Sequence, residues 1–70
     1  MALWMSRRNG RAIARRLKSE EKSQMEMQRI ARQELQALGK GLAPPLQQQL
    51  LAEGMSAAAE WWRKNGSPGR

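Results

Sequence analysis

The apolar residues between Arg11 and Leu38 recur at the spacing of one helix face. Neither Pro nor Gly occurs in this stretch. With successive residues 100° apart, six apolar side chains fall on an arc of about 80°: Ile13, Leu17, Met27, Ala31, Leu35 and Leu38. Polar residues interrupt the middle of the arc, and Ser23 with Glu26 matches a capping box that would begin a second helix. Two helices joined near residues 19–23 are therefore an alternative, but we predict one helix over about residues 11–38.

Glycine and proline residues mark the boundaries of this stretch. Asn9-Gly10 is a turn dipeptide, which predicts that residues 1–10 form a separate, flexible segment. Gly39 stands where a helix end favours a left-handed residue, and Pro44-Pro45 suits the first turn of a following helix. We expect that helix over about residues 45–64, ended by Asn65-Gly66, with residues 67–70 frayed. The predicted fold is all-α, a helical hairpin over residues 11–66 with a turn at 39–44 and a basic N-terminal arm.

The composition supports a helical chain and removes the usual means of stabilising a small one. Two Ile are the only β-branched residues of the 70, whereas good helix formers dominate. A chain of this length buries only about 60% of its unfolded surface. The absence of Cys and His excludes a disulfide and an ordinary zinc site. We therefore expect oligomerisation or docking onto a larger partner to add stability.

The same absences argue against catalysis. The chain has no His base, no Cys nucleophile and no Asp. Glu20 and Glu21 are adjacent, but neighbours on a helix point about 100° apart and cannot act on one substrate atom. We predict a non-enzymatic protein without a metal or another cofactor. No apolar run approaches the roughly 18 residues of a membrane span, so no transmembrane segment is expected.

Positive charge is concentrated in the first quarter of the chain. The net charge is +7, and residues 1–18 hold six basic groups and no acidic one. This asymmetry is typical of a binding arm. Arg11, Arg15, Lys18 and Lys22 recur at i, i+4, i+7 and i+11 and share an arc of about 60°. Because Arg binds phosphate bidentately, we predict nucleic-acid binding by seven residues: Arg7, Arg8, Arg11, Arg15, Arg16, Lys18 and Lys22.

Several partners suit such a stripe, and RNA is favoured over DNA. Arg-rich helices bind structured RNA, and no helix-turn-helix spacing is evident. Residues 12–16, followed by Glu20-Glu21-Lys22, resemble the arginine-rich arm of lambdoid phage N-type antitermination proteins, although the Trp usual in that arm has no counterpart here. An acidic protein, a membrane surface or a merely solvated face are the alternatives. The location expected is cytoplasmic, with a mitochondrial transit peptide as the minority interpretation.

The second predicted helix has an unusually wide apolar face. Its apolar arc reaches about 180°, more than the roughly 100° that covers one neighbouring helix. Trp61 and Trp62 point about 100° apart, so both can hardly enter one small core. A thick core of a self-contained hairpin would explain the width, but we favour a protein interface. Its predicted residues are Leu46, Leu50, Leu51, Met55, Trp61 and Trp62.

Together these patterns predict a small basic adaptor or regulatory protein. It would bind nucleic acid through its N-terminal helix, and a protein partner or a second copy through its Trp/Leu face. One alternative is a small structural subunit of a large assembly, such as a ribonucleoprotein or phage particle. The other is an amphipathic peptide at a membrane surface. A regulator should fold or bind in isolation, whereas a structural subunit should be largely disordered until its assembly is supplied.

Overall fold

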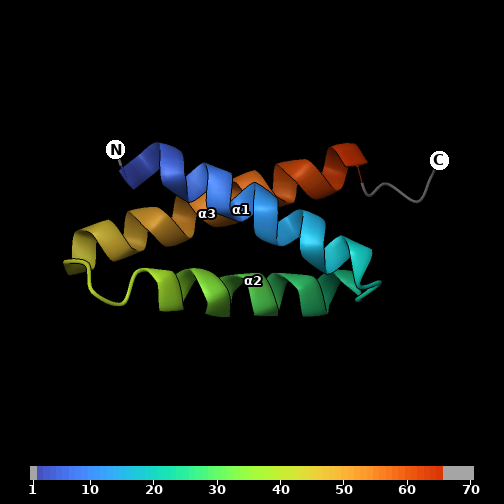
Figure 1. The fold of residues 1–70 in the computed structure, drawn as a ribbon, viewed down its shortest axis with the longest axis horizontal. Helices are drawn as coiled ribbons and strands as arrows, with labels where there is room; N and C mark the ends of the chain where they lie inside the picture. The colour runs from blue at the N-terminus through green and yellow to red at the C-terminus, as the bar shows by residue number, and fades with distance from the viewer. Residues whose placement is uncertain (1, 66–70) are drawn as a thin grey trace.

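Three helices make up the part of the chain that the structure describes. The structure is a computed structural model; it describes residues 2–65, with side chains from Met5 onward. The helices are α1 (Ala2–Ser19), α2 (Gln24–Leu38) and α3 (Pro44–Asn65). Figure 1 shows α1 and α3 crossing each other, with α2 running beneath both. The all-α prediction is confirmed for this range, but the two-helix hairpin is wrong because the chain folds into three helices.

The chain reverses direction at residues 20–23, where we predicted a continuous helix. Glu21 has a φ of 60°, a left-handed conformation that ends α1. Ser23 then caps α2, because its Oγ accepts a hydrogen bond of 3.2 Å from the Glu26 backbone N–H. The predicted arc is polar at this point, so a straight helix would bury nothing there. Reversal lets the apolar residues of α2 fold back against α1 and α3.

Asn9-Gly10 is not a turn, since residues 2–10 belong to α1. Gly10 is buried inside the helix, and a Cβ atom placed on it would lie 2.1 Å from the backbone oxygen of Gly54. The backbones of α1 and α3 therefore meet at this pair of glycines. Small residues continue the contact one turn away on either side of Gly10, where Ser6 and Ala14 are also buried. Gly10, which we predicted to lie in a turn, therefore permits close packing of the two helices.

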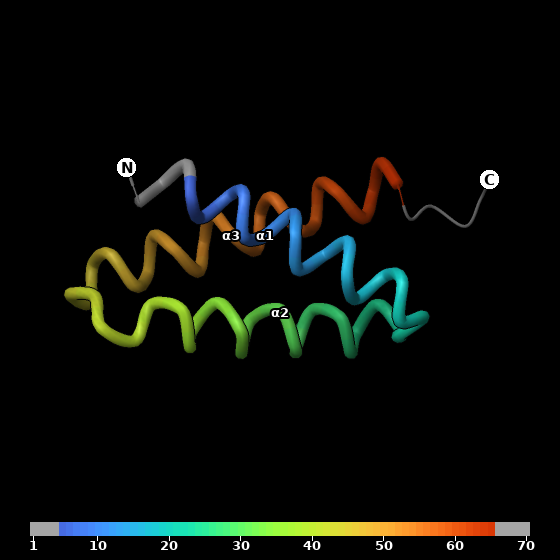
Figure 2. The backbone as a smooth tube through the Cα atoms, viewed as in Figure 1, coloured from blue at the N-terminus to red at the C-terminus, as the bar shows by residue number. Residues whose placement is uncertain are grey.

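The turn between α2 and α3 lies where the glycine and proline residues predicted it. Gly39 ends α2, and its N–H donates to the Leu35 and Gln36 carbonyls at 3.1 and 3.2 Å. Its φ is −87°, so the expected left-handed cap is wrong. Glycine fits this position because it has no side chain: a Cβ on Gly39 would lie 3.0 Å from Leu50 Cδ2. The two connections lie at opposite ends of the molecule (Figure 2). The predicted frayed tail, residues 67–70, lies outside the described residues.

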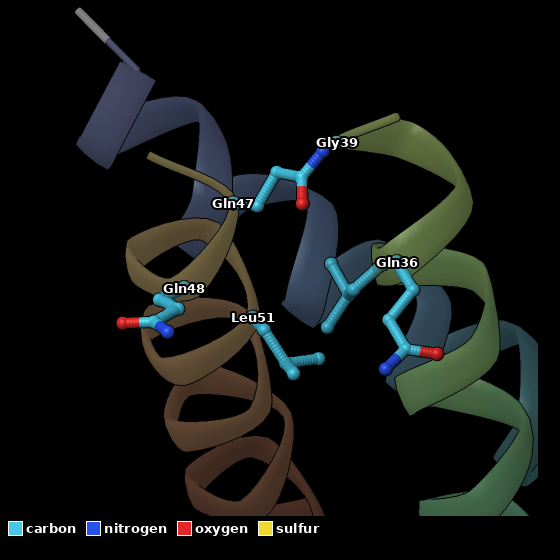
Figure 3. Close-up of a pocket in the computed structure, with 6 residues that line it drawn as sticks. Gln36, Gly39, Gln47, Gln48 and Leu51 are labelled. Carbon is cyan, nitrogen blue, oxygen red and sulfur yellow. The ribbon is translucent and has the colours of Figure 1, made fainter. Parts of the chain in front are cut away.

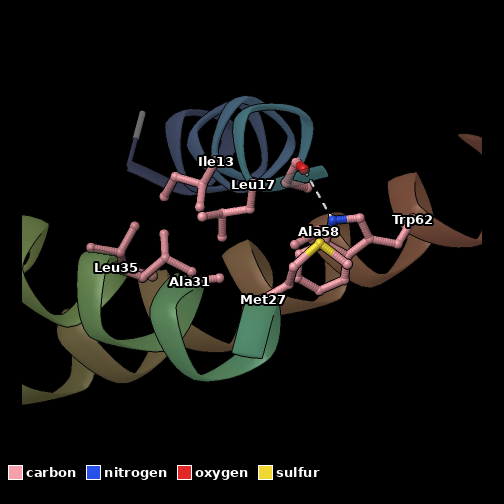
Figure 4. Close-up of a cluster of buried hydrophobic side chains, with 9 residues drawn as sticks. Ile13, Leu17, Met27, Ala31, Leu35, Ala58 and Trp62 are labelled. Carbon is pink, nitrogen blue, oxygen red and sulfur yellow. Dashed lines mark hydrogen bonds between the residues drawn. The ribbon is translucent and has the colours of Figure 1, made fainter. Parts of the chain in front are cut away.

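All three helices contribute to one hydrophobic core (Figure 4). The Trp62 indole is 4% exposed, and its Nε1–H donates to the Ala14 carbonyl oxygen at 3.0 Å. Leu38, which the predicted arc included, is 54% exposed. The core is therefore built within a single chain, around the crossing of α1 and α3. Its buried members are Ile13, Ala14, Leu17, Met27, Ala31, Leu35, Leu50, Ala58 and Trp62.

Candidate nucleic-acid interface

Four basic residues lie along the outward face of α1. Arg8, Arg11, Arg15 and Lys18 are all exposed and recur at i, i+3, i+7 and i+10. This spacing keeps their side chains on one side of the helix, over a rise of about 15 Å. Within the described residues, no carboxylate oxygen comes within 4.0 Å of their charged nitrogen atoms. We call these four residues the basic face.

Arg7, also predicted to bind nucleic acid, instead connects α1 to α3. Its guanidinium lies 3.3 Å from a carboxylate oxygen of Glu53 and 2.6 Å from one of Glu60. Both glutamates lie on α3, one on each side of the glycine crossing in sequence. Their two carboxylates neutralise Arg7, so this residue stabilises the packing of the two helices.

Arg16 forms the corresponding contact with α2. Its Nη1 donates to Glu34 Oε1 at 3.1 Å, its Nη2 pairs with the other oxygen of that carboxylate, and Nε lies 3.6 Å from Glu20. The hydrogen bond to Glu34, opposed by partial burial and helped by both carboxylate charges, raises the pKa of Arg16 above its ordinary value. Lys22 lies beyond the end of α1, 3.9 Å from Glu20, and does not continue the basic stripe.

A tryptophan lies beside the basic face. Trp61 is half-buried and, together with Arg8, Arg11, Ala12 and Arg15, lines an open groove of about 380 Å³. Trp61 comes from the last two turns of α3, where the Asn65 side chain donates to its carbonyl oxygen at 3.1 Å. The crossing of the helices brings it to α1 from 46 or more positions away in sequence. The local periodicity of the sequence does not indicate such a contact, and it led us to predict Trp61 at a protein interface.

The residues predicted to form the protein interface have different environments. Trp62 and Leu50 are buried in the core, while Leu51 and Met55 are half-buried against it. Leu46 is 40% exposed. It lies near the turn between α2 and α3, where Leu38 and Leu42 are 54% and 36% exposed. Of the exposed large apolar side chains of the described chain, three leucines lie at this end, Met5 and Met25 lie near the starts of α1 and α2, and none lies on the Trp-bearing part of α3.

A smaller pocket lies between α2 and α3. It has a volume of about 180 Å³, and Figure 3 shows Gln36, Gln47 and Leu51 among the side chains that line it. These amide groups carry no charge, so the pocket is a weaker candidate for a polyanion than the basic face. Among the residues described, no group of three or more His, Cys, Asp or Glu side chains could hold a metal ion. As far as the structure describes them, none of the helices is long and apolar enough to cross a bilayer.

Comparison with known proteins gave no match: no family model, no curated protein and no solved structure is significantly similar to the chain. The resemblance of residues 12–22 to a phage antitermination arm therefore gains no support.

Proposed function

We propose that this protein is a non-enzymatic nucleic-acid-binding adaptor whose basic face contacts phosphate groups, with RNA favoured over DNA. One observation carries the proposal. Arg7 and Arg16 are paired with glutamates of the other helices, whereas Arg8, Arg11, Arg15 and Lys18 point outward without a carboxylate partner among the described residues. Cations held together in this way repel one another until they pair with a polyanion. The counterions that the polyanion's phosphate groups then release supply the binding free energy.

A surface that only kept the protein soluble would carry a different arrangement of charge. Solvating surfaces usually intersperse both signs, as α2 does with Glu26, Arg29, Arg32 and Glu34. The outward face of α1 carries one sign only, and three of its four basic residues are Arg. The planar guanidinium makes two parallel hydrogen bonds to one phosphate. RNA is favoured because arginine-rich helices read the shape and backbone of structured RNA.

The adaptor part of the proposal rests on the exposed leucines around the turn between α2 and α3. Leu38, Leu42 and Leu46 are exposed around the turn between α2 and α3, and none of them belongs to α1, which carries the basic face. A protein partner or a second copy of the chain that covered them would leave the basic face accessible. Light scattering on the nuclease-treated protein would detect a second copy.

The salt dependence of RNA binding tests the basic face. Changing Arg8, Arg11 and Arg15 together to Gln should reduce the slope of log Kd against log salt by about 2 to 3, because each lost phosphate contact removes about 0.7 to 0.9. Anisotropy of a labelled RNA hairpin measures the slope. The matched control changes Arg29, Arg32 and Lys40 to Gln, which removes the same charge from other exposed positions.

The control variant should keep nearly the wild-type slope. Equal losses in the two variants would show that net charge alone drives binding, and an unchanged slope in the first would remove the basic face from the function. Tighter binding to anionic vesicles than to RNA would favour the membrane-surface alternative. A chain without helix in isolation would favour a structural subunit of a larger assembly.

A further inference from the structure

We infer that the groove between the basic face and Trp61 holds an unpaired nucleobase, so that the preferred ligand is single-stranded or bulged nucleic acid. This inference rests on the proposed function and specifies its ligand. The groove combines guanidinium groups from Arg8, Arg11 and Arg15 with the indole of Trp61. A nucleotide offers the two matching surfaces, an anionic phosphate and a flat aromatic base.

The size of the groove suits this ligand. Its volume of about 380 Å³ lies within the range of small-ligand sites, which begins near 300 Å³. The groove is open to solvent, so a strand can enter it from the surface. The charged residues lie on successive turns of α1, and a flexible backbone can follow them from one phosphate to the next.

Packing of the hydrophobic core does not explain why Trp61 lies at this position. The neighbouring Trp62 fills the core, and its indole N–H bonds to Ala14 at 3.0 Å. Trp61 packs only partly against this core and keeps an exposed portion facing the arginines. An exposed indole beside cations is the arrangement by which proteins stack bases while tracking a phosphate backbone.

Two other polyanions use only part of this surface. A duplex keeps its bases stacked on one another, so it would present mainly sugar and phosphate to Trp61. An acidic peptide would pair with the arginines but has no general need for an aromatic wall. An unpaired base uses the arginines and the indole together. Because every base has a π face, the expected preference is for strand state and not for sequence.

Three probes with the same number of phosphate groups distinguish the contribution of the indole to binding from that of the cations. They are single-stranded RNA, duplex RNA and inorganic polyphosphate. Trp61→Leu should weaken binding of the single strand about 5- to 150-fold, the range expected for loss of one stacked base. It should leave polyphosphate and duplex binding within about twofold, because the phosphate contacts remain. Trp61→Phe should recover part of the affinity, since a phenyl ring still stacks. Met25→Ala, which removes an apolar side chain that is 80% exposed on α2, should change none of the three.

The outcomes distinguish the two proposals. If the arginine variant weakens all three probes but Trp61→Leu has no selective effect on the single strand, the nucleobase site is wrong and the proposed function stands. If Trp61→Leu weakens all three probes equally, the indole only supports the fold and the inference is again overturned. If no probe loses affinity in the arginine variant, the proposed function itself fails. Circular dichroism of each variant confirms that its helices are intact.

Discussion

Two adjacent tryptophans on α3 have opposite environments. Trp62 is 4% exposed and donates a buried hydrogen bond to the Ala14 carbonyl, a group that also lies within a helix. Trp61 is half-buried and faces the arginines of α1. Because successive helical residues point about 100° apart, one indole can fill the core while the next reaches its edge. Loss of the two indoles should therefore affect different properties of the protein.

Trp62→Phe should lower the free energy of unfolding by about 2 kcal/mol. The change removes one hydrogen bond, worth about 0.5–1.5 kcal/mol, and leaves space in the core. Trp61→Phe should cost less than about 1 kcal/mol, since that side chain is only half-buried and a phenyl ring keeps part of its contact with the core. Urea unfolding followed by circular dichroism measures both. Equal losses would contradict the assignment of one indole to the core and the other to the groove.

At the scale of the elements, the fold depends on how closely α1 and α3 approach. A Cβ on Gly10 would lie 2.1 Å from the Gly54 carbonyl oxygen, 2.8 Å from its carbonyl carbon and 2.9 Å from its Cα. A Cβ on Gly54 would lie 2.6 Å from Leu35 Cδ1. The first clash involves backbone, which moves only if a whole helix moves, and the second involves the end of a side chain. Gly10 therefore limits the helix separation more strictly than Gly54 does.

Gly10→Ala should destabilise the protein by about 2 kcal/mol or more, although Ala favours a helix by about 1 kcal/mol. Gly54→Ala should cost less, because Leu35 can change its rotamer. Gly41→Ala is the matched control, since a Cβ there meets nothing within 4 Å and no glycine in the described range has a positive φ. We expect it to be neutral or to stabilise by up to about 1 kcal/mol. A thermal-unfolding series that ranks Gly10→Ala as harmless would show that the helices do not cross here.

At the scale of the whole molecule, charge opposes folding while it favours binding. A net charge of +7 is carried by 70 residues, and the basic face adds like charges one turn apart. The exposed ion pairs of Arg7 and Arg16 each offset only a small part of this repulsion, on the order of 1 kcal/mol or less. The molecule should therefore behave as a folded core whose electrostatic repulsion a polyanion relieves.

Raising the salt concentration should raise the Tm of the protein while it weakens RNA binding. Between about 0.01 and 0.15 M, the Debye length falls from about 30 to 8 Å, which screens repulsion along α1. The variant in which Arg8, Arg11 and Arg15 are changed to Gln should show a smaller rise. Adding RNA at about 100 times its Kd should stabilise the wild type by about 2.7 kcal/mol. A Tm that falls with salt would mean that the ion pairs outweigh the repulsion.

The local patterns of the sequence were sufficient to predict the helical class of the protein and much of its core. The spacing of Met27, Ala31 and Leu35 correctly predicted the buried face of α2, and the glycines and prolines located the turn before α3. These features depend on helix geometry and backbone preferences, which act over a few residues. The divergence of Trp61 and Trp62 follows from the same geometry.

Contacts between distant residues set the remaining features, and no local pattern encodes them. Gly10 belongs to a turn dipeptide in sequence, but contact with Gly54 keeps it helical and buried. The reversal at Glu21 depends on whether the second half of the long apolar arc can bury itself against α3. Which arginines are neutralised depends on glutamates 18 to 53 positions away, so the charge exposed on α1 emerges only when the helices pack.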